Sequence, residues 1–409
     1  MASGKLWTIA YRDLLRNRRR SIFTLLAVAL GLALLMVING LIAGMMEDAL
    51  QNNIRLRTGH VQLRAPSYQE KKVSLQWQDL LDNPDGLATR INSMSEVKAA
   101  APVLWAGSSL STGAESVGVR IFGIDPASQL YNPIRESRVS GEFLTPDDRN
   151  GIMIGQRLAD SLGVGVGDRV NLALVNADGK ADEANFTIRS LFSTGIASYD
   201  ESAAFMPLHK AQAFARTGER ASAVVVLLNR QDDTDKVAAA IQSPGAATLT
   251  WRESNQLFLQ TIETALSFYV ILDGIVMLIV AVIIANTLLM AVFERIREIG
   301  ILAALGMRGR QIMLMFLFEA FILGLAGVVV GFAFGSVGVA YLSNVGIPLG
   351  EAASAAGSTF ALGSTMYAHF VPGTFMWLSV WTLIFVLLAS LYPARFAARQ
   401  EPADALKAL

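Results

Sequence analysis

The chain has 409 residues, of which 53% are hydrophobic and only 17% are charged. This balance excludes an ordinary soluble protein, and the length is that of about two to three domains. The formal net charge is zero, so no overall field favours nucleic acid or an acidic substrate. The sequence contains no cysteine, which excludes disulfides, thiolate metal sites and cysteine catalysis.

Four long apolar runs predict membrane-spanning helices, at residues 22–46, 266–293, 312–342 and 374–392. At about 1.5 Å per residue, each run is long enough to cross a hydrocarbon core of about 30 Å. A cleaved signal peptide is the alternative for the first run, but its apolar stretch exceeds the usual length of about 7–15 residues. The pattern therefore predicts one span, a large segment, and then three spans.

The short segments beside these runs differ in their basic residues. One set carries Lys5, Arg12, Arg16, Arg18, Arg19, Arg20, the four arginines of the loop 294–311, Arg395, Arg399 and Lys407. The other short loop, residues 343–373, contains neither Lys nor Arg. Because short basic loops stay in the cytoplasm, we expect both termini and the loop 294–311 inside, and residues 47–265 outside.

The two ends of the chain each allow two interpretations. Trp7, Tyr11 and Leu14 recur at helical spacing before an arginine cluster, which is typical either of a helix in the cytoplasmic interface or of a simple topology anchor. At the other end, Pro393 is expected to end the last span at residue 392. The remaining tail, 393–409, would be either a contact for a cytoplasmic partner or a membrane anchor.

The large segment between the first and second runs has a mixed signature, which predicts an α+β domain of two lobes. Strand-like stretches lie at 60–63, 116–123, 170–175 and 223–228, and helical ones at 156–162 and 236–241. The segment has no basic stripe for nucleic acid. The chain's three histidines, His60, His209 and His369, show no ligand spacing, so we expect no metal site.

The loop between the second and third runs has a helical pattern. Ile296, Ile299 and Leu302 recur at three-residue spacing among charged residues, and Gly306 is expected to stop the helix. A short amphipathic helix joined to two spans is well placed to be held by a second protein, whose movement would reach the spans directly. The alternative is a polar loop whose charges only fix orientation.

Two ionisable residues lie inside predicted spans, where charge is costly and is a candidate for function. Asp273 lies about two turns from the outer end of the second run, where it is either functional or simply reaches the headgroups. Glu319 would bind an arginine near the loop or cap a junction. The glycines after it, Gly324, Gly327, Gly331, Gly335 and Gly338, predict a face for close helix packing.

The sequence lacks the motifs of an enzyme that would energise transport. No stretch reads G-x-x-x-x-G-K-[S/T], the backbone cradle for nucleotide phosphates, and no G-x-S-x-G, H-E-x-x-H or kinase set is present. The chain is therefore expected not to be an enzyme by itself. If it does work, a separate ATPase supplies the energy through the inner loop.

Several of these stretches together resemble a known family, the FtsX/MacB-type permeases of the mechanotransmitting ABC class, and most closely its LolC/LolE lipoprotein-releasing branch. The resemblance covers nearly the whole chain. The segments that carry it are RDLLRNRRRS (12–21), TGHVQLRAPSYQ (58–69), IMIGQRLADSLGVGVGDRV (152–170), ERIREIGILAALGM (294–307), FLFEAFILGLAG (316–327) and YPARFAARQEPADAL (392–406). MacB itself carries a fused nucleotide-binding domain that this chain lacks.

Together with the apolar runs, the resemblance implies a membrane protein with four transmembrane α-helices, one plus three, and a large α+β extracytoplasmic domain between the first and second. It would be a multi-pass protein of the bacterial inner membrane. The expected parts are a lead-in helix (1–21), spans at 22–46, 266–293, 312–342 and 374–392, a periplasmic domain (47–265), a coupling loop (294–311), a periplasmic loop (343–373) and a tail (393–409).

The resemblance further implies that residues 294–306 form a coupling helix that docks in a groove of a cytoplasmic ABC ATPase dimer. Its docking residues would be Glu294, Arg295, Ile296, Arg297, Glu298, Ile299, Gly300, Leu302, Leu305 and Gly306. A second permease, identical or a sister chain, would pair with this one in membrane lipid. The chain itself would hold no cofactor, since ATP and Mg belong to the ATPase, and Glu319 would be structural.

The function that follows is extraction of lipoproteins or another amphiphile from the outer leaflet of the inner membrane. A regulator of a cell-envelope enzyme, as FtsX-like proteins are, and a MacB-like efflux permease are the alternatives. On the docking hypothesis, an aspartate in place of Ile299 or Leu302 would abolish co-purification of the ATPase, because the apolar face of the docked helix would be lost.

Overall fold

The computed structural model describes residues 16, 18–69, 72–113, 115–350 and 363–400. The chain divides into two compact units. The helical unit comprises residues 1–45, 262–347 and 366–409, and the soluble unit comprises residues 46–261 and 348–365. Most of the expected lead-in helix, residues 1–15 and 17, and the tail residues 401–409 lie outside the described residues.

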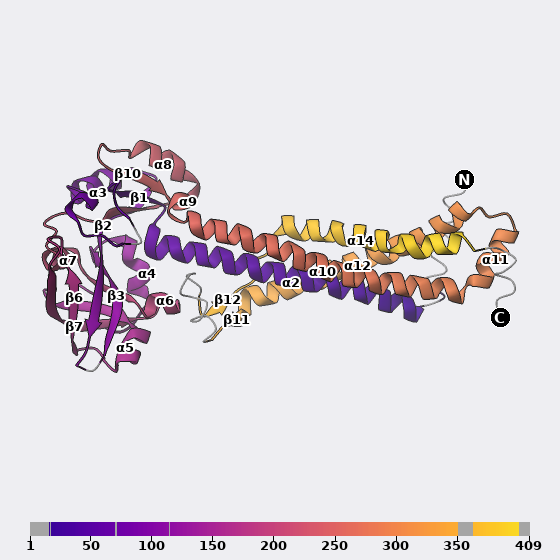
Figure 1. Cartoon of the computed structure of the whole chain (residues 1–409), viewed down its shortest axis with the longest axis horizontal. Helices are drawn as coiled ribbons and strands as arrows, with labels where there is room; N and C mark the ends of the chain where they lie inside the picture. Colours follow the sequence, from indigo (N-terminus) through magenta and orange to yellow (C-terminus); the bar gives the residue numbers. More distant parts are fainter. Residues whose placement is uncertain (1–15, 17, 70–71, 114, 351–362, 401–409) are drawn as a thin grey trace. The chain divides into compact units, whose positions relative to one another are not determined.

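The helical unit is built on the four predicted spans (Figure 1). The long helices are α2 (Arg18–Asn53), α10 (Gln256–Glu294), α12 (Gly309–Val345) and α14 (Pro372–Ala398). Within the described residues, these four are the helices long and apolar enough to cross a membrane. The predicted arrangement of one span, a folded domain and three further spans is confirmed, although α2 and α10 both extend beyond their apolar runs.

Glycines bring two of these helices together. A Cβ added at Gly331 of α12 would lie 2.7 Å from the carbonyl oxygen of Ala29 in α2, and one at Gly327 would lie 2.7 Å from the Cβ of Val28. Gly335 and Gly338 also face α2, whereas Gly324 faces α14. The predicted packing face is therefore confirmed, and it lets the backbones of α2 and α12 approach closely.

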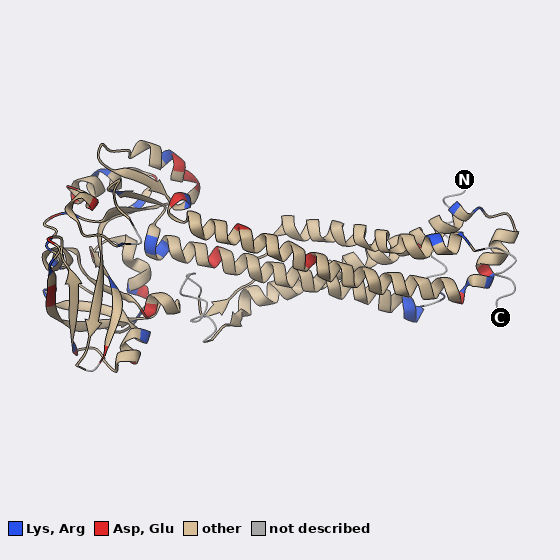
Figure 2. Cartoon of the chain, in the orientation of Figure 1, with Lys and Arg blue, Asp and Glu red and all other residues tan. Residues whose placement is uncertain are grey.

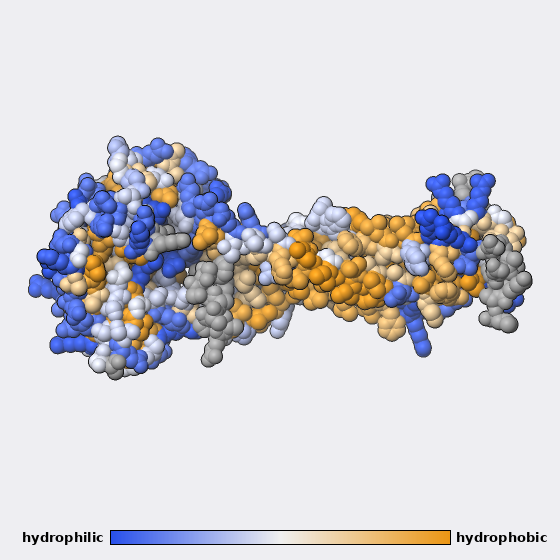
Figure 3. All heavy atoms as spheres, in the orientation of Figure 1, coloured by the Kyte–Doolittle hydropathy of each residue, from blue (hydrophilic) through white to orange (hydrophobic). Residues whose placement is uncertain are grey.

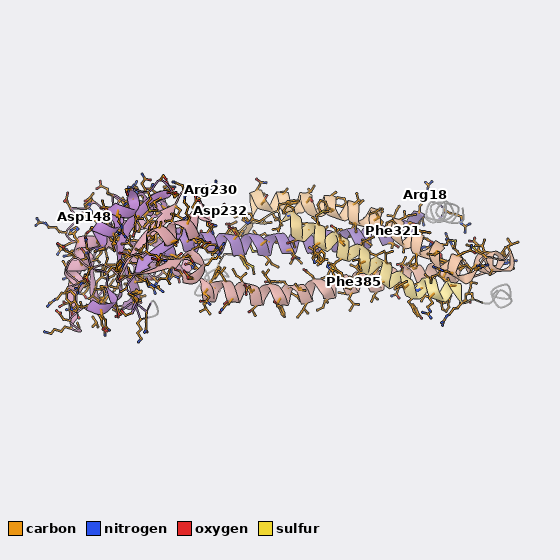
Figure 4. All side chains as sticks on the ribbon, turned by 90° about the horizontal axis from the view of Figure 1, so that it is seen from above. Arg18, Asp148, Arg230, Asp232, Phe321 and Phe385 are labelled. Carbon is orange, nitrogen blue, oxygen red and sulfur yellow. The ribbon has the colours of Figure 1, made fainter. Side chains whose placement is uncertain are left out.

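Larger side chains fill the remaining interior of the helical unit. Leu32, Met36, Met277 and Phe375 form a buried cluster, against which the half-buried Phe385 packs. Figure 4 labels Phe385 on α14. On the face seen in Figure 3, apolar residues cover most of the middle of these helices. An apolar surface of this extent is suited to lipid rather than to water.

The last helix differs from the prediction. α14 does not end at residue 392 but continues to Ala398, with Pro393 inside it. A proline within a helix removes one hydrogen bond and costs about 3 kcal/mol. Here Ala394 and Ala397 are fully buried in a cluster with α12, and that packing offsets the loss. The helix therefore ends where its packing ends.

The soluble unit holds ten of the chain's strands, which belong to one sheet. They are β1 (Val61–Arg64), β2 (Val97–Ser111), β3 (Ser116–Ile124), β4 (Arg138–Gly141), β5 (Gly151–Gly155), β6 (Arg169–Val175), β7 (Ala181–Phe192), β8 (Ala203–Pro207), β9 (Ala223–Leu228) and β10 (Ala247–Thr250). Its helices are α3 (Pro84–Asn92), α4 (Asn132–Glu136), α5 (Gln156–Leu162), α6 (Ala197–Asp200), α7 (Leu208–Ala215), α8 (Thr234–Ala240) and α9 (Trp251–Ser254).

The long strand β2 divides this unit into two lobes. Its first half pairs with β9, which continues through β1 to β10, all antiparallel. Helices α3 and α8 cover this smaller lobe, where Ile91 and Val237 pack with Val224 and Val226 of β9. The predicted two-lobe α+β domain is confirmed, and the strand predictions at 60–63, 116–123, 170–175 and 223–228 fall on β1, β3, β6 and β9.

The second half of β2 belongs to a closed ring of six strands. The order is β2, β3, β8, β5, β7 and β6, and β6 pairs with both β7 and β2. Alternate side chains point inward, so that Leu172 of β6, Ile188 of β7 and Ile121 of β3 meet in one buried core. Closure removes the free edges of these six strands.

The loop between α12 and α14 is divided between the two units. Of its described residues, 348–350 and 363–365 belong with the soluble unit, where Ile196 and Gly363 form an isolated antiparallel bridge. Short strands β11 (Ile347–Pro348) and β12 (Thr365–Met366) pair with each other.

Candidate coupling site

A backbone break separates the second span from the short helix that follows it. α10 ends at Glu294, and Arg295 adopts φ −113° and ψ 14°, outside the helical region. The helix α11 then runs from Ile296 to Ala304. Its direction is therefore not simply that of α10, and it must be fixed by contacts of its side chains.

The predicted stop at Gly306 is confirmed. Gly306 has φ +93°, a left-handed conformation that favours glycine. The N–H of Gly306 donates to the carbonyl of Ala303 at 3.0 Å, and that of Met307 to the carbonyl of Leu302 at 3.1 Å. These bonds use the last free carbonyls of α11, so that α12 begins three residues later at Gly309.

One face of α11 is buried within its own chain. Ile299 is only 2% exposed and packs in a cluster with Ile312 and Phe316 of α12 and with Ala394 of α14. Gly300 is buried as well, and Ile296 and Leu302 are half-buried. The apolar side chain of Ile299 therefore holds α11 against the chain's own spans, and its contact with an ATPase stays a prediction.

The opposite face of α11 is open. Arg297, Ile301 and Leu305 follow one another at four-residue spacing on this face, and Ile301 is 46% and Leu305 81% exposed. Glu298, Ala304 and Gly306 are exposed beside them. The sequence pattern of Ile296, Ile299 and Leu302 concealed this second, outward-facing set, to which Ile301 and Ala304 belong.

Four charged side chains form a row behind the joint, which we call the ionic chain: Arg295, Glu319, Arg20 and Glu294. Oε1 of Glu319 lies 3.3 Å from Nη2 of Arg20, and its Oε2 lies 3.7 Å from Nη1 of Arg295. Nη1 of Arg20 also lies 2.9 Å from Oε2 of Glu294. Each oxygen of Glu319 thus faces an arginine from a different helix or joint.

The inner part of the ionic chain is shielded from water. The side chains of Glu319 and Arg295 are 1% and 4% exposed. A buried charge without a partner costs several kcal/mol, so this pair depends on its mutual contacts. Of the two interpretations of Glu319, the binding of an arginine near the loop is confirmed. Charged residues are sparse along the rest of the long helices (Figure 2).

A second ionic contact lies nearer the surface. Arg16, before α2, pairs with Glu298 of α11, and both side chains are more than half exposed. Exposed pairs of this kind contribute about 0–1 kcal/mol. From the sequence, Arg16 and Arg20 were expected only to fix the orientation of the chain in the membrane. Nothing in the sequence indicated their acidic partners.

The other ionisable residue of the spans, Asp273, has an amide partner. Nδ2 of Asn39 in α2 donates to both carboxylate oxygens of Asp273, at 3.1 and 3.2 Å. Because α10 begins at Gln256, Asp273 lies almost five turns from the start of its helix rather than about two. Asn39, a polar residue in an otherwise apolar run, was the available signal for this pair.

The buried polar groups of the soluble unit have structural partners. Nδ1 of His60 accepts the backbone N–H of Leu228 at 2.9 Å, and burial lowers the pKa of His60 below its usual value of 6.5. Asp200 accepts bonds from Ser193, Thr194 and Gly195, while burial raises its pKa. Among the described residues, no group of three or more His, Asp and Glu side chains is placed to hold a metal ion.

Four apolar helices, an α/β domain between the first and second, and a short surface helix between the second and third define a multi-pass membrane protein of the permease class. Two family models match the chain: the MacB-like periplasmic core domain over residues 21–243, and the FtsX-like permease C-terminal domain over residues 270–402. The chain belongs to this family of ABC transporter permeases and is an inner-membrane multi-pass protein.

Full-length relatives support the assignment. The chain is 25% identical over 426 residues to the lipoprotein-releasing system transmembrane protein LolC of Neisseria meningitidis, covering 96% of this chain and 95% of the relative. It is 24% identical to LolE of Haemophilus influenzae, over 94% and 93% of the two chains. A shorter match, 36% identical over 30% of this chain and 16% of the relative, is to the macrolide export ATP-binding/permease protein MacB of a Shewanella strain.

Proposed function

We propose that this chain is the permease subunit of an ATP-driven ABC transporter that extracts lipoproteins or a similar amphiphile from the outer leaflet of the inner membrane. The loop that contains α11 faces the cytoplasm, and the soluble unit faces the periplasm. A cytoplasmic ABC ATPase dimer, which holds ATP and Mg, docks on α11. A second permease completes the assembly, which acts on its cargo without a pore. The open face of Arg297, Ile301 and Leu305 is the observation that carries this proposal.

The open face of α11 presents exposed apolar side chains that a partner can cover, on a helix whose other face is held in place. A leucine that is 81% exposed at the tip of a helix gains free energy when a partner covers it. Ile299 is held against α12 and α14 on the opposite side, so α11 is not free to turn its apolar residues away from a partner. Movement of a docked ATPase would thus be passed to the spans.

The orientation rests on the distribution of basic residues. Arg308, Arg310, Arg395 and Arg399 are all exposed near the end of the helical unit that holds α11. Residues 343–373, between α12 and α14, contain no Lys or Arg. Since basic residues flanking spans are retained inside, the α11 side is the cytoplasmic side.

The choice of cargo rests on the relatives. LolC and LolE, whose names describe lipoprotein release, align with nearly the whole chain, including the soluble unit, whereas the match to MacB covers less than a third of it. An amphiphile already in the outer leaflet does not need to cross the membrane. A folded domain moved by the spans is suited to lifting it out.

Docking is tested by Leu305→Asp and Ile301→Asp in the full chain, each co-expressed with its cognate ABC ATPase. We expect each variant to reach the membrane normally but to retain less than about a tenth of the co-purifying ATPase, because a desolvated aspartate opposes burial of the face. Leu305→Met keeps an apolar anchor and should retain the ATPase. Unchanged co-purification of both aspartate variants would exclude this face as the docking site.

The cargo is tested in proteoliposomes that contain the permease, its ATPase and an acylated lipoprotein. We expect release of the lipoprotein to a soluble acceptor when ATP is supplied, and none with a non-hydrolysable analogue. A macrolide substituted for the lipoprotein should not be moved. ATP-driven movement of the macrolide with no release of lipoprotein would instead favour the efflux function.

A further inference from the structure

We propose that Glu319 is a positioning residue for coupling, which fixes the direction of α11 and links it to α2 through the ionic chain. The inference rests on the proposed docking of an ATPase on α11 and goes beyond it. Through its contacts with Arg20 and Arg295, the buried carboxylate of Glu319 would pass a movement of α11 to the first span.

The joint between α10 and α11 needs such a support. Arg295 is the residue at which the helix breaks, and it is itself a member of the ionic chain. Glu294, the last residue of α10, is the other end of the same chain. The two residues that flank the break are therefore both tied to charged groups on other helices, and a swivel of α11 would have to stretch these contacts.

The ionic chain also reaches a helix that is far from α11 in the sequence. Arg20 belongs to the first turn of α2, and it contacts both Glu319 of α12 and Glu294. From this turn α2 runs without interruption to Asn53. A movement of the joint is therefore passed directly to the start of α2.

Stability alone does not account for buried ions at this position. A well-packed apolar pair of similar volume is commonly as stable as a buried ion pair, or more so, because it avoids the cost of desolvating two charges. Apolar contacts are, however, non-directional, whereas Arg20 donates a directional hydrogen bond to one oxygen of Glu319 at 3.3 Å, and Arg295 faces the other oxygen at 3.7 Å. The ionic chain thus specifies geometry, and this distinguishes a positioning role from a merely structural one.

The test uses the natural absence of cysteine from the chain. Phe23 lies on α2 three residues after Arg20 and is 72% exposed, so Phe23→Cys accepts a polarity-sensitive fluorophore at a single site. The labelled permease, bound to its ATPase in nanodiscs, is measured with and without ATP. The first variant is Glu319→Gln. The second is the double variant Arg295→Met/Glu319→Leu, which replaces the buried ion pair with a packed apolar pair and is used if the single variant does not fold.

We expect both variants to retain the ATPase but to show an ATP-dependent fluorescence change at least about fivefold smaller than that of the parent. Glu47→Gln, which removes an exposed carboxylate from the other end of α2, should leave the change intact. A full response in the double variant would overturn the proposal, because packing alone would then suffice. Failure of the parent itself to bind the ATPase would contradict the docking proposal instead, so the two failures are distinguishable.

Discussion

The two units of this protein place their apolar residues in opposite ways. In the soluble unit, large apolar side chains are buried in two clusters, one inside the closed ring of strands, with Leu172 and Ile188, and one on the outer side of its strands, with Phe205. In the helical unit, large apolar side chains such as Phe23 and Val270 lie on the outside. Its interior contains glycine contacts and a carboxylate, Glu319, that is paired with two arginines.

This difference follows from the two solvents. Water drives apolar side chains into the interior, and inward-facing positions can be recognised by alternation along strands such as β6, whose other face is partly exposed. Lipid exerts no such force between helices, and small residues and polar contacts determine which faces meet. Hydrophobicity therefore identifies the interior of the soluble unit but not that of the helical unit, where glycines and charges do so.

The largest expected effect is the difference in stability between aspartate substitutions on the two faces of α11. Ile299→Asp places a charge in a buried cluster and should cost about 4 kcal/mol or more, so the loop around α11 should become sensitive to protease. Ile301→Asp, two positions away on the open face, should change stability by less than about 0.5 kcal/mol. Limited proteolysis of both variants in detergent checks this, and equal protection would contradict the assignment of the faces.

Truncation of one leucine in each unit compares a buried position of the soluble unit with an exposed position of the helical unit. Leu172→Ala removes a fully buried side chain from the ring and should destabilise the soluble unit by about 2–5 kcal/mol. Leu30→Ala, on the exposed surface of α2, leaves no cavity within the chain and should have little effect on unfolding. Denaturant-induced unfolding of the two variants measures the difference. Similar losses would show that Leu30 is covered by another surface.

A matched pair of glycines tests the packing of the spans. Gly331→Ala puts a methyl group 2.7 Å from the backbone oxygen of Ala29, and overpacking of this kind costs about 1–3 kcal/mol. At Gly274 in α10 no atom lies within 4 Å of an added Cβ, and so Gly274→Ala should be neutral or stabilising. The thermal unfolding temperature in detergent should fall only for the first. Equal temperatures for both would exclude close contact of α2 and α12.

The smallest effect concerns pH. Because burial lowers the pKa of His60, the unfolded chain binds more protons than the folded one below about pH 6.5, and stability should fall as the pH drops below that value. The loss is at most about 2 kcal/mol at pH 5. His60→Asn keeps an acceptor but does not titrate. Hydrogen exchange in β9, corrected for intrinsic rates, should depend less on pH in this variant, and an unchanged dependence would exclude His60 as the cause.

The sequence predicted the elements well where one periodicity dominated. The strand Ala223–Leu228 and the helix Gln156–Leu162 were predicted with their observed bounds, because a buried β-branched run and a short amphipathic helix leave little choice. The one-plus-three order of spans followed from apolar runs alone. Pro393 misled the prediction, because local propensity was outweighed by the packing of Ala394 and Ala397, which only the assembled helices provide.

The short helix between the second and third spans was predicted from the sequence, but which of its residues are buried within the chain was not. Ile296, Ile299 and Leu302 have the spacing of an apolar face, and Ile299 packs against the chain's own spans, whereas Ile296 and Leu302 are half-buried. Periodicity reports which residues share a side of a helix and not what covers that side. The partners of Glu319 lie on separate helices, and no local pattern links residue 20 to residue 319.

The most direct test of the account is a photo-crosslink from the open face of α11. A benzophenone attached to Leu305→Cys, in membranes that contain the permease and its ABC ATPase, is irradiated, and the adducts are identified by mass spectrometry. We predict a covalent adduct with the ATPase, which is absent when the probe is placed at Val175→Cys in the soluble unit. If the probe at position 305 formed adducts with lipid alone while the ATPase was bound elsewhere on the chain, this result would contradict the coupling role of this face.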